Sequence, residues 1–298
     1  MRINKVIFLN LTLTFFFSIV CFNLFSQSLN KVDSCLLQLS KKKYVSSDEI
    51  IKHVNDFFLN DRDRYEIYFK WIATNLKYNE YVSIKEPDRI FKQKTASCQG
   101  YSALLKYFCD KSAIECVIID GYSKGDTKDI NNIPSPNHTW NAVKIEHKWY
   151  LSDVTFASLK GNKGKVIYEF DENYFLCSPP NFILEHFPKE NKYQFLPKFV
   201  KKNTFLKWPF FYSKYFTNNF TINTKRLRGI VRRKVLLEFL NFQGDEKLFI
   251  LTDGIDTFPI KVINKNGKIV LNINAIKTNE KKLTLYYNEQ AIMGFKKL

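Results

Sequence analysis

The chain has 298 residues, and its 46 Lys and Arg outnumber 29 Asp and Glu, which gives a formal net charge of +17. This length suits two domains better than one. The sequence contains no Cys/His cluster with metal-ligand spacing and no glycine-rich phosphate loop, so we expect no metal, no nucleotide and no other cofactor.

Residues 1–26 have the layout of a secretory signal peptide. Arg2 and Lys5 precede the apolar run 6–24, and the segment ends in Phe25-Ser26. The alternative is a membrane anchor, because the run approaches the roughly 20 apolar residues that a span needs. Polar residues within the run favour cleavage, so we expect an exported protein, periplasmic or extracellular. Five cysteines would remain after cleavage, which leaves at least one thiol unpaired.

Two amphipathic helices are expected before residue 77. The sequence Ser46-Ser47-Asp48-Glu49, followed by an apolar series, is typical of a helix start. A stronger pattern over residues 62–76 predicts a helix with one apolar face, formed by Tyr65, Tyr68, Phe69, Ile72 and Leu76.

Cys98 follows a polar turn, residues 95–97, and opens an apolar series at helical spacing: Tyr101, Leu104, Leu105 and Phe108. Thr95 or Ser97 is expected to cap this helix by accepting a backbone hydrogen bond. Cys98 then lies in the first turn and points toward the packed face, where the helix dipole stabilises a thiolate. The alternative is a small buried apolar residue without chemistry.

Two strands, residues 138–145 and 148–156, are predicted to form a hairpin around the turn Glu146-His147. If the turn has two residues, His138, Trp140, Asp153 and Thr155 share one face, since side chains alternate along a strand. Asp153 is then the diagonal neighbour of His138. A slip of one residue would move the carboxylate to the other face.

These residues supply the parts of a thiol enzyme. Cys98 would be the nucleophile, His138 its base, and Asp153 the group that orients the imidazole. The backbone N–H of Cys98 is the expected donor to an oxyanion, and the phenol of Tyr78 is a second candidate. Taken singly, His138 and Asp153 also fit a satisfied strand histidine and a turn carboxylate.

The segments CQGYSALLKYFC and HTWNAVKIEHKWYLSDVTFA resemble the core of the transglutaminase-like cysteine enzymes. The flanks Trp71-Ile72-Ala73, Tyr78 and residues 174–188 agree, so the resemblance covers about residues 60–195. It is strongest to secreted bacterial members related to kyphoscoliosis-type peptidases.

The resemblance implies an α+β, papain/transglutaminase-like core in which the Cys-bearing helix packs on an antiparallel sheet. It assigns nucleophile, base and orienting acid to Cys98, His138 and Asp153, and places Gln99 and Trp140 near the substrate. Thr139 departs from the small Ala that is common between the His and the Trp. Glu146-His147 departs from an Asp-Gly type turn.

The sequence pattern changes near residue 200, where strand-like runs separated by turns begin. Strand-like runs cover residues 236–242, 247–251, 258–263, 268–276, 283–287 and 291–295. Asp253-Gly254 and Asn266-Gly267 are typical turn dipeptides. Several short strands at this spacing predict a C-terminal antiparallel β-sandwich. The polar loop 121–137, which leads into His138, is expected to rim the cleft, and the alternative is a disordered insertion.

Positive charge concentrates in the same region. Residues 201–298 hold 19 Lys and Arg against 7 Asp and Glu, a net charge of +12. The densest cluster is Arg226, Arg228, Arg232, Arg233 and Lys234. Such a module favours an anionic surface, whereas export argues against nucleic acid. The alternative is a composition that is rich in Lys throughout.

The sequence therefore predicts a signal peptide (1–26), a transglutaminase-like catalytic domain (27–199) and a β-sandwich domain (200–298). The expected function is acyl transfer on amide or peptide bonds of a protein or peptide substrate, including cell-wall peptide. By analogy, hydrolysis by a cysteine peptidase or amidase is favoured over crosslinking. The alternatives are a non-catalytic binding or scaffold protein that retains the fold, and a thiol domain that assists recognition by the C-terminal domain.

Overall fold

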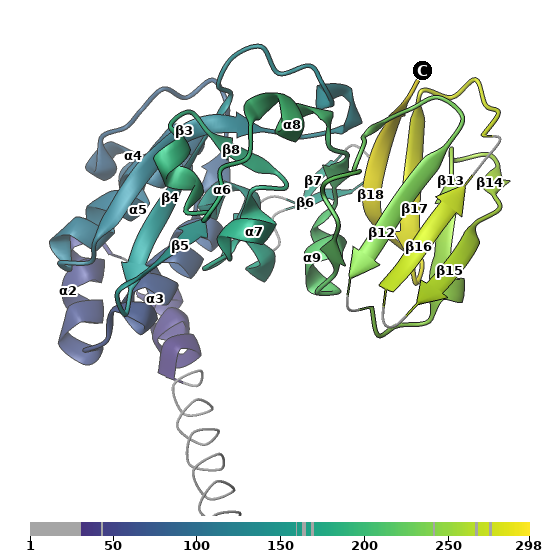
Figure 1. Cartoon of the computed structure of the whole chain (residues 1–298). Helices are drawn as coiled ribbons and strands as arrows, with labels where there is room; N and C mark the ends of the chain where they lie inside the picture. Colours follow the sequence, from purple (N-terminus) through teal and green to yellow (C-terminus); the bar gives the residue numbers. More distant parts are fainter. Residues whose placement is uncertain are drawn as a thin grey trace, which may run out of the picture. The chain divides into compact units, whose positions relative to one another are not determined.

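The computed structural model describes residues 31–42, 44–158, 160–162, 165–167, 170–240, 242–265, 268–273 and 276–298. Contacts divide the chain into two compact units, residues 1–115 and residues 116–298, each described below by itself (Figure 1). The predicted signal peptide and the turn Asn266-Gly267 lie outside the described residues. Within the described part, no helix is long and apolar enough to cross a membrane. The domain boundary near residue 200 stays a prediction.

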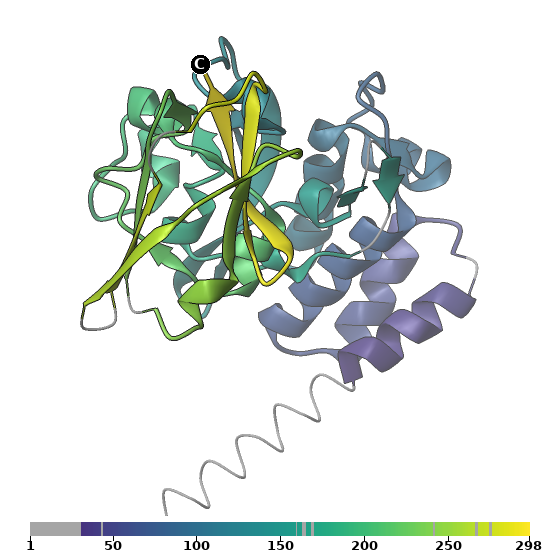
Figure 2. The same cartoon turned by 90° about the vertical axis from the view of Figure 1, so that its right-hand side faces the viewer.

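The first unit is mainly helical, as the purple and blue ribbons of Figure 2 show. After a helix over residues 31–41, its elements are α2 (Ser47–Phe57), α3 (Asp61–Asn75), β1 (Lys77–Tyr78), α4 (Pro87–Gln93), β2 (Thr95–Ala96) and α5 (Cys98–Lys111). The side chain of Ser46 accepts the backbone N–H of Glu49 and so caps α2, as the sequence predicts. Asn60 caps α3 through the N–H of Asp63 in the same way.

Helix α3 forms the centre of this unit. The predicted apolar face of α3 and Leu76, which follows the helix, is buried: Tyr65, Tyr68, Phe69, Ile72 and Leu76 are at most 2% exposed. The hydroxyl of Tyr101 in α5 donates to the carbonyl of Leu76 at 2.8 Å. This bond, with the packing of apolar side chains, fixes α5 and its first residue, Cys98, against α3.

The second unit begins with an antiparallel sheet in the order β5-β4-β3-β8. Its strands are β3 (Cys116–Ser123), β4 (His138–Ile145), β5 (Lys148–Ser152) and β8 (His186–Pro188). The predicted register is confirmed, since Ile145 pairs with Lys148 across a two-residue turn. Both turn residues, Glu146 and His147, have positive φ (49° and 63°), which matches the right-handed twist of the strands.

The second strand of the hairpin ends earlier than predicted. It stops at Ser152, and residues 154–158 form the short helix α6 (Val154–Ser158) instead of continuing to Phe156. The reason is local. The carboxylate of Asp153 accepts the backbone N–H groups of Thr155 and Phe156, which is the hydrogen bonding of a helix N-cap.

Further elements lie between the strands of this sheet or between the sheet and the C-terminal strands. They are η1 (Thr127–Asp129), β6 (Lys160–Asn162), β7 (Lys165–Ile167), η2 (Glu172–Tyr174), α7 (Pro179–Phe182), η3 (Asn191–Gln194), α8 (Lys202–Lys207), β9 (Phe210–Phe211) and α9 (Ser213–Thr217).

The strand-rich C-terminal region contains two sheets (Figure 1). One has the order β10-β12-β16-β15, with β10 (Thr221–Ile222), β12 (Val235–Leu240), β16 (Lys268–Ile273) and β15 (Lys261–Lys265). The other has the order β11-β18-β17-β13-β14, with β11 (Ile230–Val231), β18 (Gln290–Lys297), β17 (Lys282–Tyr287), β13 (Phe249–Thr252) and β14 (Thr257–Phe258), and β9 also pairs with β18. Side chains of both sheets, such as Leu237, Leu271 and Leu285, share one buried cluster.

Two details of this region differ from the expectation. The strand predicted over residues 258–263 is divided into β14 and β15, and Pro259, which lacks a backbone N–H, stands between them. Strand β11 pairs with β18 in parallel, so the region is not purely antiparallel. The turn at Asp253-Gly254 is present, with Gly254 at φ +99°.

Candidate active site

The hairpin of β4 and β5 brings His138 and Asp153 together. His138 is the first residue of β4, and its Nε2 lies 2.5 Å from Oδ2 of Asp153. The loop before it is closed at its base, because the side chain of Asn137 accepts from the N–H and donates to the carbonyl of Ser123. His138 is 8% exposed and Asp153 is fully buried.

The carboxylate of Asp153 is ionised in spite of its burial. Burial raises the pKa of this group, but the charge interaction with His138 and the hydrogen bonds from His138 and His186 outweigh it and hold the pKa well below its usual range. Oδ1 accepts the N–H groups of Thr155 at 2.9 Å and Phe156 at 3.0 Å. Both oxygens are therefore fixed by hydrogen bonds.

His186 belongs to this cluster, although the sequence did not suggest it. It is the first residue of β8, and its Nε2 lies 2.9 Å from the same Oδ2 of Asp153. Its ring stacks on Phe182 at a centroid distance of 4.2 Å and is 1% exposed. Burial lowers the pKa of His186, although Asp153 acts in the opposite direction. The sequence offered one cue for His186, its place within residues 174–188, which belong to the family resemblance. No spacing pattern linked this histidine to Asp153.

His138, Asp153 and His186 are also residue types that bind transition metals, and their donor atoms lie within 4.8 Å of one another. However, each nitrogen–oxygen distance is that of a hydrogen bond, 2.5 and 2.9 Å. A carboxylate and two imidazole N–H groups produce this arrangement without an ion. We therefore interpret the cluster as a hydrogen-bonded one.

Cys98 is the first residue of α5, in the other unit, and is half-buried. The expectation that Thr95 or Ser97 caps this helix is wrong. Ser97 occupies the N-cap position, but its side chain makes no capping hydrogen bond, and the hydroxyl of Thr95 donates to the carbonyl of Gln93. Helix starts leave their first N–H groups without intrahelical acceptors, and the side chain of Ser97 does not replace one here. That the side chains of Cys98 and His138 lie close together stays a prediction.

The remaining predicted residues have different surroundings. Tyr78 in β1 pairs with Ala96 in β2, two residues before Cys98, and Gln99 is exposed. Trp140 is 1% exposed in β4 and packs against the ring of His138 at a centroid distance of 6.1 Å. Trp140 is thus placed to support the imidazole, and its nearness to a substrate stays a prediction.

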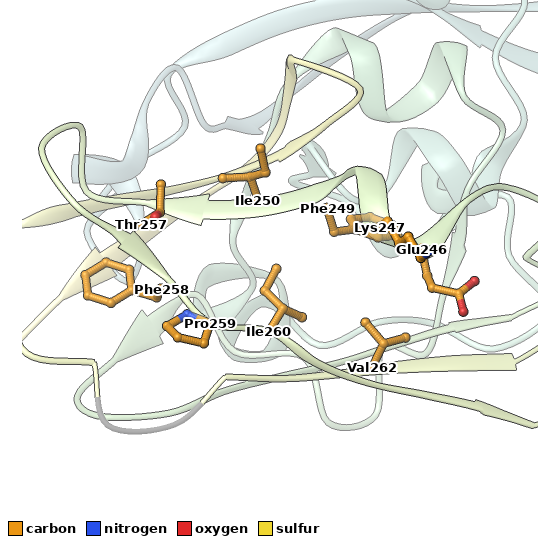
Figure 3. Close-up of a pocket in the computed structure, with 9 residues that line it drawn as sticks. All are labelled: Glu246, Lys247, Phe249, Ile250, Thr257, Phe258, Pro259, Ile260 and Val262. Atoms are coloured by element: carbon orange, nitrogen blue, oxygen red, sulfur yellow. The ribbon is translucent and has the colours of Figure 1, made fainter.

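A separate pocket of about 590 Å³ lies in the C-terminal region (Figure 3). It is lined by Glu246, Lys247, Phe249, Ile250, Thr257, Phe258, Pro259, Ile260 and Val262. The lining is mostly apolar and includes neither a cysteine nor a histidine. It therefore lacks the residue types of the predicted chemistry, and Cys98, His138 and Asp153 remain the candidate catalytic residues.

Comparisons with known proteins test the predicted resemblance to the transglutaminase-like cysteine enzymes. Residues 53–154 match the family model described as the transglutaminase-like superfamily. The chain therefore contains a core domain of the transglutaminase-like superfamily, within which Cys98, His138 and Asp153 fall.

Among individual proteins, the human kyphoscoliosis peptidase is 29% identical over 181 residues, which are 57% of this chain and 27% of that protein. The Lim and transglutaminase domain protein ltd-1 of Caenorhabditis elegans is 22% identical and is covered over 30% of its length, with 68% of this chain. The matched part thus spans less than a third of these relatives. A solved structure described as a TGase has a TM-score of 0.30 at 16% identity, covering 49% of this chain and 37% of that one.

Proposed function

We propose that the protein is a thiol enzyme in which Cys98, His138 and Asp153 form a catalytic triad for acyl transfer. The observation that carries the proposal is the buried contact of 2.5 Å between His138 and an ionised Asp153. Such a carboxylate fixes the tautomer of the imidazole and stabilises its charged form. The position of Cys98 at the start of helix α5 supports the proposal, since that end of a helix stabilises a thiolate.

The proposed reaction begins when the Cys98 thiolate attacks the carbonyl carbon of an amide or peptide bond. Backbone N–H groups at the start of α5 donate to the oxygen, which carries the developing negative charge. The carbon–nitrogen bond then breaks, His138 gives its proton to the leaving amine, and the acyl group stays on sulfur as a thioester. Water or a second amine attacks the thioester and restores the thiol.

Hydrolysis is the favoured outcome, with a protein or peptide, including cell-wall peptide, as the substrate. The match to a protein named a peptidase supports this choice. The second candidate is a non-catalytic binding protein that retains the fold. The ionised Asp153 beside His138 favours the enzyme, because a binding surface has no need for a buried, charged pair.

Alkylation by iodoacetamide across pH, with the label located by mass spectrometry, tests the proposal. We expect fast labelling of Cys98 near neutral pH. Burial raises the pKa of Cys35 to about 11 and that of Cys177 well above its usual range, so these two thiols serve as slow internal standards. Labelling of Cys98 no faster than that of a free thiol, whose pKa is about 8.5, would contradict the proposal.

Two histidine variants sharpen the test. His138→Ala should slow the alkylation of Cys98 strongly, whereas His147→Ala, in the exposed turn of the same hairpin, should not. A peptide library and a fluorescent primary amine, offered together, then separate the two fates of the acyl group. Cleaved peptides with water added indicate a peptidase, and incorporated amine indicates crosslinking.

We also propose export and contact with an anionic surface. The basic cluster of residues 225–234 is exposed at Lys225, Arg226, Arg228, Arg232, Arg233 and Lys234. Backbone hydrogen bonds join its neighbourhood to two further basic segments, through Ile276 to Arg233 and through Lys296 to Gly229. No ion pair links these exposed cations to another described residue, which supports an external anionic partner.

A further inference from the structure

His186 and the carboxylate of Asp153 carry an inference that rests on the proposed function and refines it. Four hydrogen bonds converge on this carboxylate: two from backbone N–H groups of α6 to Oδ1, and two from imidazole nitrogens to Oδ2. The nitrogens belong to His138 and His186. A triad of nucleophile, base and acid accounts for only one of the two imidazoles.

The contacts determine which nitrogen of each histidine carries a proton. An ionised carboxylate only accepts, so Nε2 of His138 and Nε2 of His186 both donate to Asp153. Nδ1 of His186 is buried and has no hydrogen-bond partner among the described residues. A proton there would be a buried, unsatisfied donor, so His186 is neutral with its proton on Nε2.

The same assignment applies to the base. With Nε2 of His138 donating to Asp153, Nδ1 is the basic nitrogen that takes the proton of the thiol. The tautomer of His138 therefore depends on where Oδ2 of Asp153 is held. His186 contacts that atom from β8, while His138 contacts it from β4.

We propose that His186 is a positioning residue, which holds Oδ2 of Asp153 toward His138 and weakens the basicity of the carboxylate. A second donor to Oδ2 draws electron density from it, so the carboxylate stabilises the His138 imidazolium less strongly. His138 then releases the proton on its Nδ1 more readily to the leaving amine. Because His186 is neutral and enclosed by Phe182, Phe156 and Trp140, it adds a hydrogen bond without adding a second positive charge.

The main test compares His186→Phe with His186→Gln. Phe fills a similar volume without a donor, whereas the Gln amide nitrogen can occupy the place of Nε2. We expect His186→Phe to slow the alkylation of Cys98 about tenfold or more, because Oδ2 of Asp153 is no longer held toward His138. The alkaline inflection of the pH profile should move to higher pH, because a carboxylate with one donor fewer is more basic and stabilises the His138 imidazolium. His186→Gln should restore most of both. Equal profiles for wild type and His186→Phe would overturn the proposal.

The matched control is Glu185→Gln, next in the chain and equally buried. Burial raises the pKa of Glu185 well above its usual range, so the residue is neutral and the amide is nearly isosteric. It should leave the profile unchanged. A shift equal to that of His186→Phe would instead indicate a general effect of packing and would overturn the proposal.

Nitrogen-15 NMR of the histidine rings gives a readout that does not depend on reactivity. We expect a neutral Nε2–H tautomer for His186 from pH 6 to 8, and the opposite tautomer would overturn the proposal even if His186→Phe fails to fold. An unreactive Cys98 in the wild-type protein would refute the proposed function instead, so the two failures are distinct. EDTA should change neither readout. A change would point to a metal at this cluster and against the proposal.

Discussion

Thr155 donates its backbone N–H to Oδ1 of Asp153 at 2.9 Å, while Oδ2 of the same carboxylate faces two imidazoles. Asp153 therefore ends strand β5, begins helix α6 and orients the candidate base at once. Substitutions that keep or remove one carboxylate oxygen of Asp153 distinguish its role in capping α6 from its role in orienting His138.

Asp153→Asn should preserve the helix cap and impair the chemistry. Its carbonyl oxygen can accept the N–H of Thr155, but its NH₂ group then faces two imidazole donors, so His138 must adopt the other tautomer. We expect alkylation of Cys98 to slow by at least about 100-fold. Asp153→Ala should in addition destabilise the protein by about 3–5 kcal/mol, because it leaves buried donors unpaired. Urea unfolding, monitored beside the alkylation rate, distinguishes the two variants.

The pH dependence of stability provides a further check on Asp153. Its pKa is lower in the folded protein than in the unfolded chain, so its contribution is present above about pH 4 and is lost as the pH falls further. Asp153→Asn should lack this acid-dependent part. An identical loss of stability in acid for wild type and variant would contradict a charged Asp153.

Gly121→Ala should disturb the strand that holds His138. Gly121 in β3 pairs with His138 on one side and with Pro188 of β8 on the other. A Cβ at this position would clash with the carbonyl of Phe187 and with the indole of Trp140. We expect a loss of about 1–3 kcal/mol, as for overpacked cores, together with slower alkylation of Cys98.

Gly125→Ala is the control for Gly121→Ala. The added Cβ would have only one neighbour within contact distance, Oδ2 of Asp129 at 3.7 Å. Its unfolding curve should coincide with that of the wild type within about 0.5 kcal/mol. An equal loss of stability in the two variants would show that the clash of a Cβ at position 121 is not the cause.

Lys124 should make stability depend on pH on the alkaline side. Its side chain is 1% exposed, donates to the carbonyl of Phe205 at 2.7 Å, and burial lowers its pKa to about 7. Between pH 7 and about 10.5 the unfolded chain holds a proton that the folded protein has lost, so stability rises with pH in this window. Below pH 7 both states are charged, and the cost of burial is complete.

The check is Lys124→Met, measured by urea unfolding from pH 6 to 10. Its stability relative to wild type should become more favourable as the pH falls through this range, because the variant has no charge to bury. Lys128→Met, at an exposed position of η1, should leave the slope of the wild type unchanged. A variant at position 124 with the wild-type slope would show that the Lys124 pKa is not lowered.

The basic cluster predicts binding to anionic polymers that is sensitive to salt. Reversal of Arg232, Arg233 and Lys234 to Glu should weaken retention on heparin and reduce the dependence of binding on salt, since fewer counterions are released. The control carries the same three reversals at Lys85, Arg89 and Lys92, which are exposed in the helical unit. Equal losses in both proteins would indicate an effect of net charge alone.

Much of the site region was predictable because its cues are local. The period of apolar residues gave α3 and α5, and a two-residue turn fixed the register of β4 and β5. The end of β5 was not predicted, since the pattern of alternating residues continues past Ser152 and only the hydrogen bonds of Asp153 end the strand there. His186 escaped prediction for another reason: its contact with Asp153 joins residues 33 positions apart through the order of strands in the sheet, which no local pattern encodes.

The turn between β4 and β5 offers a route to a more stable protein. Glu146 and His147 both adopt left-handed backbone angles, a conformation that costs residues other than glycine about 1 kcal/mol each. Exchange of the pair for Asn-Gly should raise the melting temperature without touching the core. It would also delete a solvent-facing histidine, so that reagents specific for imidazole would report more selectively on His138.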